Sequence, residues 1–570
     1  MQWLTRVICT VATTQQVLPV ARSGRLHPRL AQRPQGASSS TDSDCWLAMP
    51  RFYLLIAATL LFVAGGTAPA SAQTLDDVFR YSERAPAIGP HDTGWLDANG
   101  TAGSGTYTAL FSNPAGLGWA SSSTFAGGLV GDFTTNEGRL SLPDADAGPF
   151  DRTQSGYRIG NAALTYRVPT EQGNLVLGAA IGRTRSFDRT LVASGINGQS
   201  SITDTFLPSS PSPLPNDDGS FTFDRRLTTL AFDAGAIEFD PSRADSPTND
   251  FIQAVRPGAG RTVEQREDLI ESGGLYDTSF GGAIEVAPDV MFGGAFTVAF
   301  GSYSFDRIYE EADINNTHTG SQYDVILGDG AVLSGFDALT YEQGIEADLT
   351  GFGARFGASA KPVDQLRLGV SFATPTYYTV TETFGTRIET FFDEGGSLAA
   401  GSIDDNEFEY EVRTPWRVSA GAELDLGPFN LAGDVEVIDW STLNFTAEGA
   451  GLGVERDIDR QIRELDVTVN SRVGASFSMD ALTVRGGTAF QPNPDDSGTR
   501  SDRTFFSGGI SYAFDSQLTF DFGWMQERFT DEFVAYGTTE VPDARGTAPG
   551  LRADEDIQRN TFSIGMRYRF

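Results

Sequence analysis

The chain has 570 residues, of which 40% are hydrophobic and 20% charged, and it is rich in glycine (64) and phenylalanine (40). Acidic residues outnumber basic ones by 75 to 41, and the net charge of −34 argues against a nucleic-acid partner, because phosphate binding requires a basic surface. Beyond the first ~75 residues, no apolar run reaches the ~18 residues that a membrane-spanning helix needs. The length would suit three or four domains unless a single large β architecture takes up the chain.

The start of the chain has the pattern of a secretory signal peptide. Over residues 49–72 an arginine is followed by an apolar run of about a dozen residues and by a final Ala-Ser-Ala. Residues 1–48 show no periodicity, and we interpret them as an over-extended gene start, with a disordered extension as the alternative. Both cysteines, Cys9 and Cys45, fall in this leader, so the secreted part is expected to have neither a disulfide nor a cysteine-based metal site.

Residues 73–121 do not alternate as a strand would. They are glycine-rich with few charges, and they end in Phe-Ser-Asn-Pro-Ala-Gly-Leu-Gly-Trp. Such a segment cannot lie in lipid with unpaired backbone groups. It is therefore expected either to hang in the periplasm or to fold as a plug inside a barrel formed by residues 122–570.

Fourteen later segments alternate apolar and polar residues, as strands do when one face contacts an apolar phase and the other contacts water. Short turns and long links alternate between them, which is the arrangement of outer-membrane barrels. An even number of strands places both ends of the barrel on the periplasmic side. The long link 188–272 could hold an extra hairpin, giving sixteen strands, and Thr262 with Gln265 could open a helix to Ile270. The expected strands are 122–134, 155–168, 174–187, 273–287, 289–305, 346–361, 364–384, 407–426, 428–445, 462–479, 481–491, 502–514, 516–530 and 559–570.

The clearest alternation lies at the end of the chain, where every second residue from Phe562 to Phe570 is apolar and the residues between are polar or small. A second stripe runs from Tyr410 through Val412 and Val418 to Leu424, with charged residues between. Charged residues that alternate with apolar ones along a strand indicate that one face of the sheet contacts water. The fold class is therefore all-β: a transmembrane antiparallel up-and-down barrel of about fourteen strands with an N-terminal plug.

The chain resembles the FadL family of outer-membrane transporters for long-chain fatty acids and other hydrophobic compounds. The resemblance rests on Asn113, Pro114 and Ala115, which match the Asn-Pro-Ala motif of that family's plug, or hatch. It also rests on Ala-Thr-Pro-Thr-Tyr-Tyr from Ala373 and on Val-Glu-Val-Ile-Asp-Trp-Ser from Val435. The final Phe570 resembles the signal read by the barrel-assembly machinery. The family implies a monomer in the bacterial outer membrane that contacts lipid and lipopolysaccharide.

The same resemblance implies how such a protein works. A hydrophobic ligand is captured outside, enters an inner pocket, and leaves sideways through the wall when the hatch moves. The expected gating residues are Asn113, Pro114, Ala115 and Gly116, because proline and asparagine together hold a defined turn. Polar side chains expected to line the lumen, and to pair across neighbouring strands, are Arg413, Arg417, Glu423, Asp434 and Glu436.

Catalysis is not expected. His91 and His318 are the histidines of the secreted part, and neither is accompanied by a recognisable nucleophile motif. The acidic cluster between Asp404 and Glu411 lacks the spacing of a calcium loop, so we interpret it as a solvated loop. No cofactor and no metal site are predicted.

Three functions remain open from the sequence. The favoured one is uptake of hydrophobic compounds, either long-chain fatty acids or hydrocarbons. The alternatives are a general porin for polar solutes, which would need an open lumen, and a barrel of the same family that acts as a shuttle in secretion or surface assembly. The negative charge should repel a fatty carboxylate unless arginines cluster locally, so neutral hydrocarbons fit at least as well.

Overall fold

The computed structural model describes residues 75–142, 148–208, 223, 225–239, 251–255, 258, 260–319, 324–327, 330–447, 452–496, 498–540 and 547–570. These residues belong to one compact unit, Thr67–Phe570. The predicted extension 1–48 and signal peptide 49–72 lie outside the described residues. No helix among the described residues is long and apolar enough to cross a membrane.

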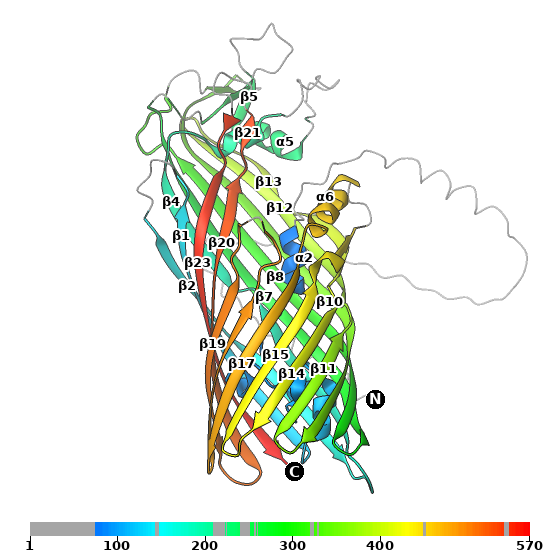
Figure 1. The fold of residues 1–570 in the computed structure, drawn as a ribbon. Coiled ribbons are helices and arrows are strands. Elements are labelled where there is room, and N and C mark those ends of the chain that lie inside the picture. Colours follow the sequence, from blue (N-terminus) through cyan, green and yellow to red (C-terminus); the bar gives the residue numbers. More distant parts are fainter. Residues whose placement is uncertain are drawn as a thin grey trace, which may run out of the picture. The chain divides into compact units, whose positions relative to one another are not determined.

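The strands form a closed antiparallel barrel with fourteen positions in its wall. The wall closes because β1 (Thr124–Leu140) pairs with β23 (Leu551–Arg569) along its whole length (Figure 1). At four positions the strand is interrupted and continues as a second element. The all-β fold class and the fourteen strands predicted from the sequence are therefore confirmed. The other wall elements are β2 (Phe150–Val168), β3 (Leu175–Ser186) with β4 (Arg189–Asn197), β7 (Val263–Ala287), β8 (Val290–Ala312), β10 (Val332–Val363), β11 (Leu366–Ala373) with β12 (Tyr377–Glu394), β13 (Gly396–Arg413) with β14 (Arg417–Asp425), β15 (Phe429–Asp439) with β16 (Asn444–Thr446), β17 (Val467–Met479), β18 (Leu482–Gln491), β19 (Arg503–Ala513) and β20 (Leu518–Tyr536).

The wall has apolar side chains outside and polar side chains inside. In β23, Phe562 and Ile564 are exposed, whereas Thr561 and Ser563 are buried. A single-layered sheet with this distribution is stable where lipid surrounds it and polar groups fill the lumen. Large apolar side chains are exposed all around the wall, among them Phe125, Leu164, Phe280, Phe296, Phe356, Val370, Val435, Val473, Ile510 and Phe522.

Strand β13 and its continuation β14 differ from the sequence expectation. The predicted single stripe from Tyr410 to Leu424 is wrong, because Tyr410 and Val412 are buried in the interior while Val418 is exposed. The break at 414–416 contains Pro415, which cannot donate a ladder hydrogen bond, and three residues outside the ladder shift the alternation by one. The same shift corrects Arg413, which was predicted to line the lumen but is exposed on the outer face.

Two predicted connections also differ. The stretch 385–406, expected to be a long link between the strands 364–384 and 407–426, is a hairpin that lengthens β12 and β13, with Gly395 and Gly396 at positive φ (104° and 110°) in its turn. The acidic residues up to Glu411 accordingly lie in β13 and not in a loop. The helix expected to open at Thr262 is also wrong, because β7 starts at Val263. The small hairpin β5 (Ile237–Phe239) and β6 (Phe251–Gln253) stays outside the wall sheet.

Folded segments fill both ends of the lumen. At the rim with the long connections, the 3-10 helix η3 (Ile202–Phe206) and the helix α5 (Arg226–Asp233) pack with wall residues into a buried apolar cluster. Smaller elements near this rim are β9 (Val325–Ile326), η6 (Trp440–Thr442), α6 (Leu452–Ile462), β21 (Thr539–Glu540) and β22 (Thr547–Ala548). The segment before β1, which we call the hatch, begins with a helix that packs beside α6 and continues toward the rim with the short turns (Figure 1). Its elements are α2 (Leu75–Ser82), α3 (Pro90–Thr93), α4 (Gly100–Gly103), η1 (Tyr107–Leu110) and η2 (Pro114–Trp119).

Candidate functional site

The Asn-Pro-Ala turn fastens the hatch to itself and to the wall. Asn113 caps η2, because its Oδ1 accepts a hydrogen bond from the amide of Ala115 at 3.1 Å. Its Nδ2 donates to the carbonyl of Thr101 at 2.6 Å and to the carbonyl of Ala358 in β10 at 3.1 Å. Pro114 takes the first helical position, where a missing amide hydrogen costs nothing. One fully buried side chain thus connects two parts of the hatch with the barrel.

Glycines on the inner face of the wall make room for this turn. A Cβ on Gly357 of β10 would overlap the Asn113 side chain, and a Cβ on Gly293 of β8 would overlap the backbone between Pro114 and Ala115. No other residue type fits at these positions unless the hatch moves. The sequence showed the high glycine content, but not that lumen-facing glycines mark the docking surface of the hatch. Similar close approaches to the hatch occur at Gly369, Gly509, Gly523 and Gly565.

A buried carboxylate anchors the other end of the hatch. Glu83 lies 2.7 Å from a guanidinium nitrogen of Arg185 and 3.1 Å from one of Arg503, with Arg500 at 3.8 Å. Burial alone would raise the pKa of Glu83, but Arg503, Arg185 and Arg500 outweigh it and lower the pKa to about 2. Glu83 is therefore ionised, and it holds the hatch against β3 and β19 at the same time.

Four of the five predicted lumen residues are in the interior and form ion pairs between strands. The fifth, Arg413, is the exception described above. Arg417 of β14 pairs with Glu436 of β15 at 3.2 Å, as its predicted cross-strand position required. The other pairs are Arg472–Asp434 at 2.6 Å and Arg367–Glu423 at 2.7 Å.

One half-buried arginine in this region lacks such a carboxylate. The guanidinium of Arg355 donates to the carbonyl of Ser112 in the hatch at 3.2 Å. Among the described residues no carboxylate lies within 4.0 Å of it, although Arg84 pairs with Asp277 nearby. Two cavities of about 60 and 30 Å³ are both lined by Arg355. Sequence reasoning missed this site, because Arg355 is the single charged residue of the stretch 351–360 and has no motif around it.

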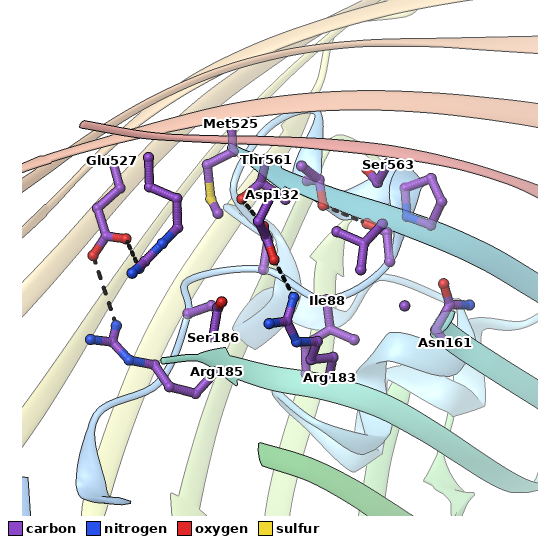
Figure 2. Close-up of a pocket in the computed structure, with 18 of the residues that line it drawn as sticks. Ile88, Asp132, Asn161, Arg183, Arg185, Ser186, Met525, Glu527, Thr561 and Ser563 are labelled. Carbon is purple, nitrogen blue, oxygen red and sulfur yellow. Dashed lines mark hydrogen bonds and ion pairs between the residues drawn. The ribbon is translucent and has the colours of Figure 1, made fainter. Parts of the chain in front are cut away.

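A further cavity of about 60 Å³ separates the hatch from β1, β20 and β23 (Figure 2). Ile88 and Met525 give it apolar walls. Arg183 pairs with Asp132 on its other side, and Thr561 donates to Asp132 at 2.7 Å. The cavity thus combines apolar and charged surfaces, which suits a ligand with both kinds of group.

The wall ladder is interrupted next to this cavity. Strand β2 pairs with β3 only from Asn161↔Gly182 to Val168↔Leu175. Beyond that point, the end of β3 and all of β4 lie deeper in the barrel, where the Asn136 side chain of β1 donates to the carbonyl of Thr190 at 2.8 Å. Both elements still pair with β7. Among the described residues, β2 therefore has no ladder partner on this side between Phe150 and Gly160.

Side chains bridge this gap in place of a ladder. Arg152 of β2 contacts both carboxylate oxygens of Asp268 of β7 at 2.8 Å. Arg158 contacts Asp188, between β3 and β4, at 2.5 and 2.9 Å. Such contacts can open without breaking any backbone pairing. We refer to this stretch as the β2–β3 gap.

The described part of the chain contains no group of three histidine, aspartate or glutamate side chains arranged to hold a metal ion. His91 lies beside Asp92 in the hatch, and His318 is buried near Asp313 at 3.4 Å.

A closed fourteen-stranded barrel with an apolar exterior and its own N-terminal segment docked in the lumen is a plugged outer-membrane channel. The sequence matches the family described as outer membrane protein transport protein (OMPP1/FadL/TodX) over residues 279–570, which is more than half of the chain. The chain belongs to this family, whose members are outer-membrane transport proteins for hydrophobic compounds. The resemblance to the FadL family noted in the sequence is thereby confirmed.

Solved structures with a similar chain path include three bacterial proteins. A FadL homologue of Pseudomonas aeruginosa is 13% identical, with a TM-score of 0.49, and the match covers 86% of this chain and all of the other. The toluene transporter TbuX of Ralstonia pickettii is 15% identical, with a TM-score of 0.42, and the match covers 85% of this chain and 99% of the other. The toluene transporter TodX of Pseudomonas putida is 13% identical, with a TM-score of 0.41, and the match covers 85% of this chain and 97% of the other. Among curated proteins no similar sequence was found.

Proposed function

We propose that the protein takes up hydrophobic compounds across the outer membrane, and that they leave the lumen sideways through the β2–β3 gap when the hatch moves. The observation that carries the proposal is the gap itself, where side-chain contacts replace the backbone ladder over Phe150–Gly160. The cavity beside it is bounded by residues 85–90 of the hatch, so a shift of the hatch would enlarge the cavity at the gap.

A side exit suits an apolar compound for an energetic reason. Each Å² of apolar surface gains roughly 25 cal/mol on leaving water, so a passage down a wet lumen would be unfavourable. A route from an enclosed cavity directly into lipid avoids that cost. Long ladders join other neighbouring strands, for example β1 with β23 and β20 with β23.

Arginines at the larger of the two cavities favour a compound that also carries a carboxylate. The sequence suggested that the negative charge of the chain would repel such an acid unless arginines gathered locally. Arg84, Arg355, Arg417 and Arg472 all line this cavity, and the half-buried Arg355 has no carboxylate partner within 4.0 Å among the described residues. We therefore propose amphipathic acids such as fatty acids as the preferred cargo, ahead of neutral hydrocarbons. In this role the protein acts as a monomer, and it performs no catalysis.

The exit route can be tested by closing the gap reversibly. The predicted mature chain contains no cysteine, so R152C/D268C can be joined by a bis-maleimide with a reducible disulfide. Uptake of a fluorescent fatty acid into proteoliposomes should fall at least tenfold after cross-linking and recover on reduction. The matched control is R552C/E532C, an ion pair at 2.5 Å between β20 and β23, which are already joined by a ladder. Unchanged uptake in the cross-linked R152C/D268C barrel would contradict a lateral exit.

The cargo can be tested separately. Mild-detergent extracts of the barrel should contain co-purified acids that mass spectrometry detects, and R355Q should lower the affinity for a fatty acid at least tenfold while leaving that for toluene unchanged. Equal losses for both compounds would refute the carboxylate role of Arg355. A general porin would conduct ions steadily without any hatch change, and the hatch and the rim loops that fill the lumen argue against this alternative.

A further inference from the structure

The short-turn rim contains a cavity of about 350 Å³, larger than the lumen cavities, between the hatch and the ends of the wall strands. The hatch contributes His91 and residues 104–107 and 119–122, and the two latter stretches flank the Asn-Pro-Ala turn on both sides. The wall contributes residues of β1, β11, β18, β19, β20 and β23. We call this space the vestibule. It lies on the opposite side of the hatch from the long-loop rim, so it faces the periplasm in the orientation implied by the family.

The lining of the vestibule has the chemistry of an anion site. Arg367, Arg485, Arg567 and Arg569 line it, and Asp480 is the one acidic residue among the lining residues. Serine and threonine hydroxyls make up most of the other polar lining. Guanidinium and hydroxyl groups are the side-chain donors that oxyanions use, and this concentration of arginine stands in a chain with a net charge of −34.

Two of these arginines share a single carboxylate. Arg567 contacts Asp521 through Nε at 2.6 Å and through a second nitrogen at 2.9 Å. Arg485 donates to Ser511 Oγ at 2.6 Å, and Ser511 in turn donates to Asp521. No carboxylate among the described residues lies within 4.0 Å of Arg485. Among Arg485, Ser511, Asp521 and Arg567, two guanidinium groups thus face one carboxylate, an excess of one positive charge that the buried Asp92 of the hatch partly offsets, because it acts on both arginines.

The excess charge is held in place by the hatch. The Arg485 guanidinium lies 5.8 Å from the centre of the Trp95 ring, and Arg367 lies 5.1 Å from that of Trp119. Arg367 is neutralised by Glu423 at 2.7 Å and donates to the carbonyl of Gly103 at 2.8 Å. The guanidinium of Arg485, which has no carboxylate within 4.0 Å among the described residues, therefore lies beside the hatch and lines the vestibule.

We propose that the vestibule binds a small oxyanion, a carboxylate or a phosphate, with Arg485 as its principal cationic partner. Because the lining comes from both the hatch and the wall, the bound anion stabilises the docked hatch. The proposal does not depend on which compound the channel transports. The anion could be a free periplasmic ion or the head group of a transported acid, and these two sources share the same binding chemistry.

The test is a calorimetric titration of the detergent-solubilised mature barrel with sodium phosphate, acetate and octanoate at constant ionic strength. The wild type should bind at least one of these anions saturably at one site, and R485Q should weaken that binding at least tenfold. R413Q is the matched control, since Arg413 is an exposed arginine of the same barrel outside the vestibule, and it should stay within twofold of the wild type. If R485Q does not fold, S511A should still weaken binding severalfold by removing the contact that orients Arg485.

The arms of the titration separate the two sources. Phosphate and acetate binding as tightly as octanoate indicates a free anion, whereas octanoate binding at least tenfold tighter than acetate indicates the head group of a transported acid. The proposal is overturned if the wild type binds none of the three saturably, or if R485Q and S511A both bind like the wild type. The fatty-acid affinity of R355Q is a separate measurement, so failure of the vestibule site and failure of the proposed cargo can be told apart.

Discussion

Replacing Asn113 by alanine should release the hatch without unfolding the barrel. The Asn113 side chain makes three hydrogen bonds, to the Ala115 amide and to the carbonyls of Thr101 and Ala358. None of them belongs to the wall ladder, which is formed by backbone groups of neighbouring strands. The change therefore acts on the contact between the hatch and β10 and leaves the pairing of β10 with β8 and β12 intact.

The expected size follows from these contacts. A net hydrogen bond contributes about 1 kcal/mol, and loss of an N-cap side chain also costs about 1 kcal/mol. Asn113 is fully buried, so the two carbonyls lose their donor without gaining water. Together the loss is about 3 kcal/mol of docking free energy. That corresponds to a roughly 100-fold larger population of the undocked hatch relative to the docked one.

Two measurements on the same sample test this reasoning. Heat-modifiable migration on a gel reports barrel folding, and ionic leak through planar bilayers reports the undocked hatch. N113A should match the wild type in the first and leak far more in the second. N430A is the control, because Asn430 bonds only weakly between wall strands, to Ser476 at 3.5 Å. Normal leak together with a lower folding yield would show that the turn merely starts the first strand, and would refute the gating role.

Three further changes probe the hatch and the gap. G357A should raise the leak as N113A does, since its Cβ would overlap the Asn113 side chain, whereas G433A, with only one ordinary contact at 3.7 Å, should not. Lowering the pH should loosen the hatch, because the pKa of Glu83 is about 2 in the folded protein and about 4.5 in the unfolded chain. The contribution of Glu83 to the stability of the docked hatch, up to about 3 kcal/mol, is complete above pH 4.5 and is lost as the pH falls toward 2. Protease protection of the hatch should follow that course, and E83Q should abolish the dependence; protection that is constant to pH 2 in the wild type contradicts it. D188N should open the β2–β3 gap and speed fatty-acid release roughly tenfold, since a charge-assisted hydrogen bond contributes about 1.5 kcal/mol. Stopped-flow transfer of the fatty acid to vesicles measures the release rate, and an unchanged rate would show that the contact between Arg158 and Asp188 does not hold the gap closed.

The wall could be predicted from the sequence because each strand has one face toward lipid and the other toward the lumen, so that apolar and polar side chains alternate along it. The outward stripe of Phe562 and Ile564 needs no knowledge of the neighbouring strands. The prediction failed where that constraint ends. Between Pro415 and the long-loop rim, the outer face of β13 carries exposed charged residues such as Arg413. In this part of the strand the alternation of polar and apolar residues therefore does not indicate which side chains face the lumen.

The interior could be predicted only in part, because partners there are distant in sequence. The Asn-Pro-Ala turn has a local signature, and the pairing of Arg417 with Glu436 follows from adjacent strands. In contrast, Gly357 becomes a docking site only because the turn at Asn113 lies against it, and Arg355 is recognisable only by the absence of a carboxylate around it in the described part of the lumen. Neither relation is encoded by spacing along the chain.

The kinds of contact around the hatch explain how it can move while the wall stays folded. Helix α2 is held by a large apolar cluster in which Phe79 and Tyr81 pack with wall residues. In the η1–η2 part of the hatch, the apolar cluster of Tyr107, Leu110 and Leu117 meets the wall mainly at small side chains such as Ala163 and Ala295, so movement of this part uncovers little apolar surface. Its stronger anchors are ion pairs and hydrogen bonds, which water entering the lumen can replace. The wall depends on continuous backbone pairing, which has no substitute in lipid. On the proposed route, hatch release is thus a local step, and the β2–β3 gap, which side chains bridge in place of a ladder, is where we expect the wall to open with it.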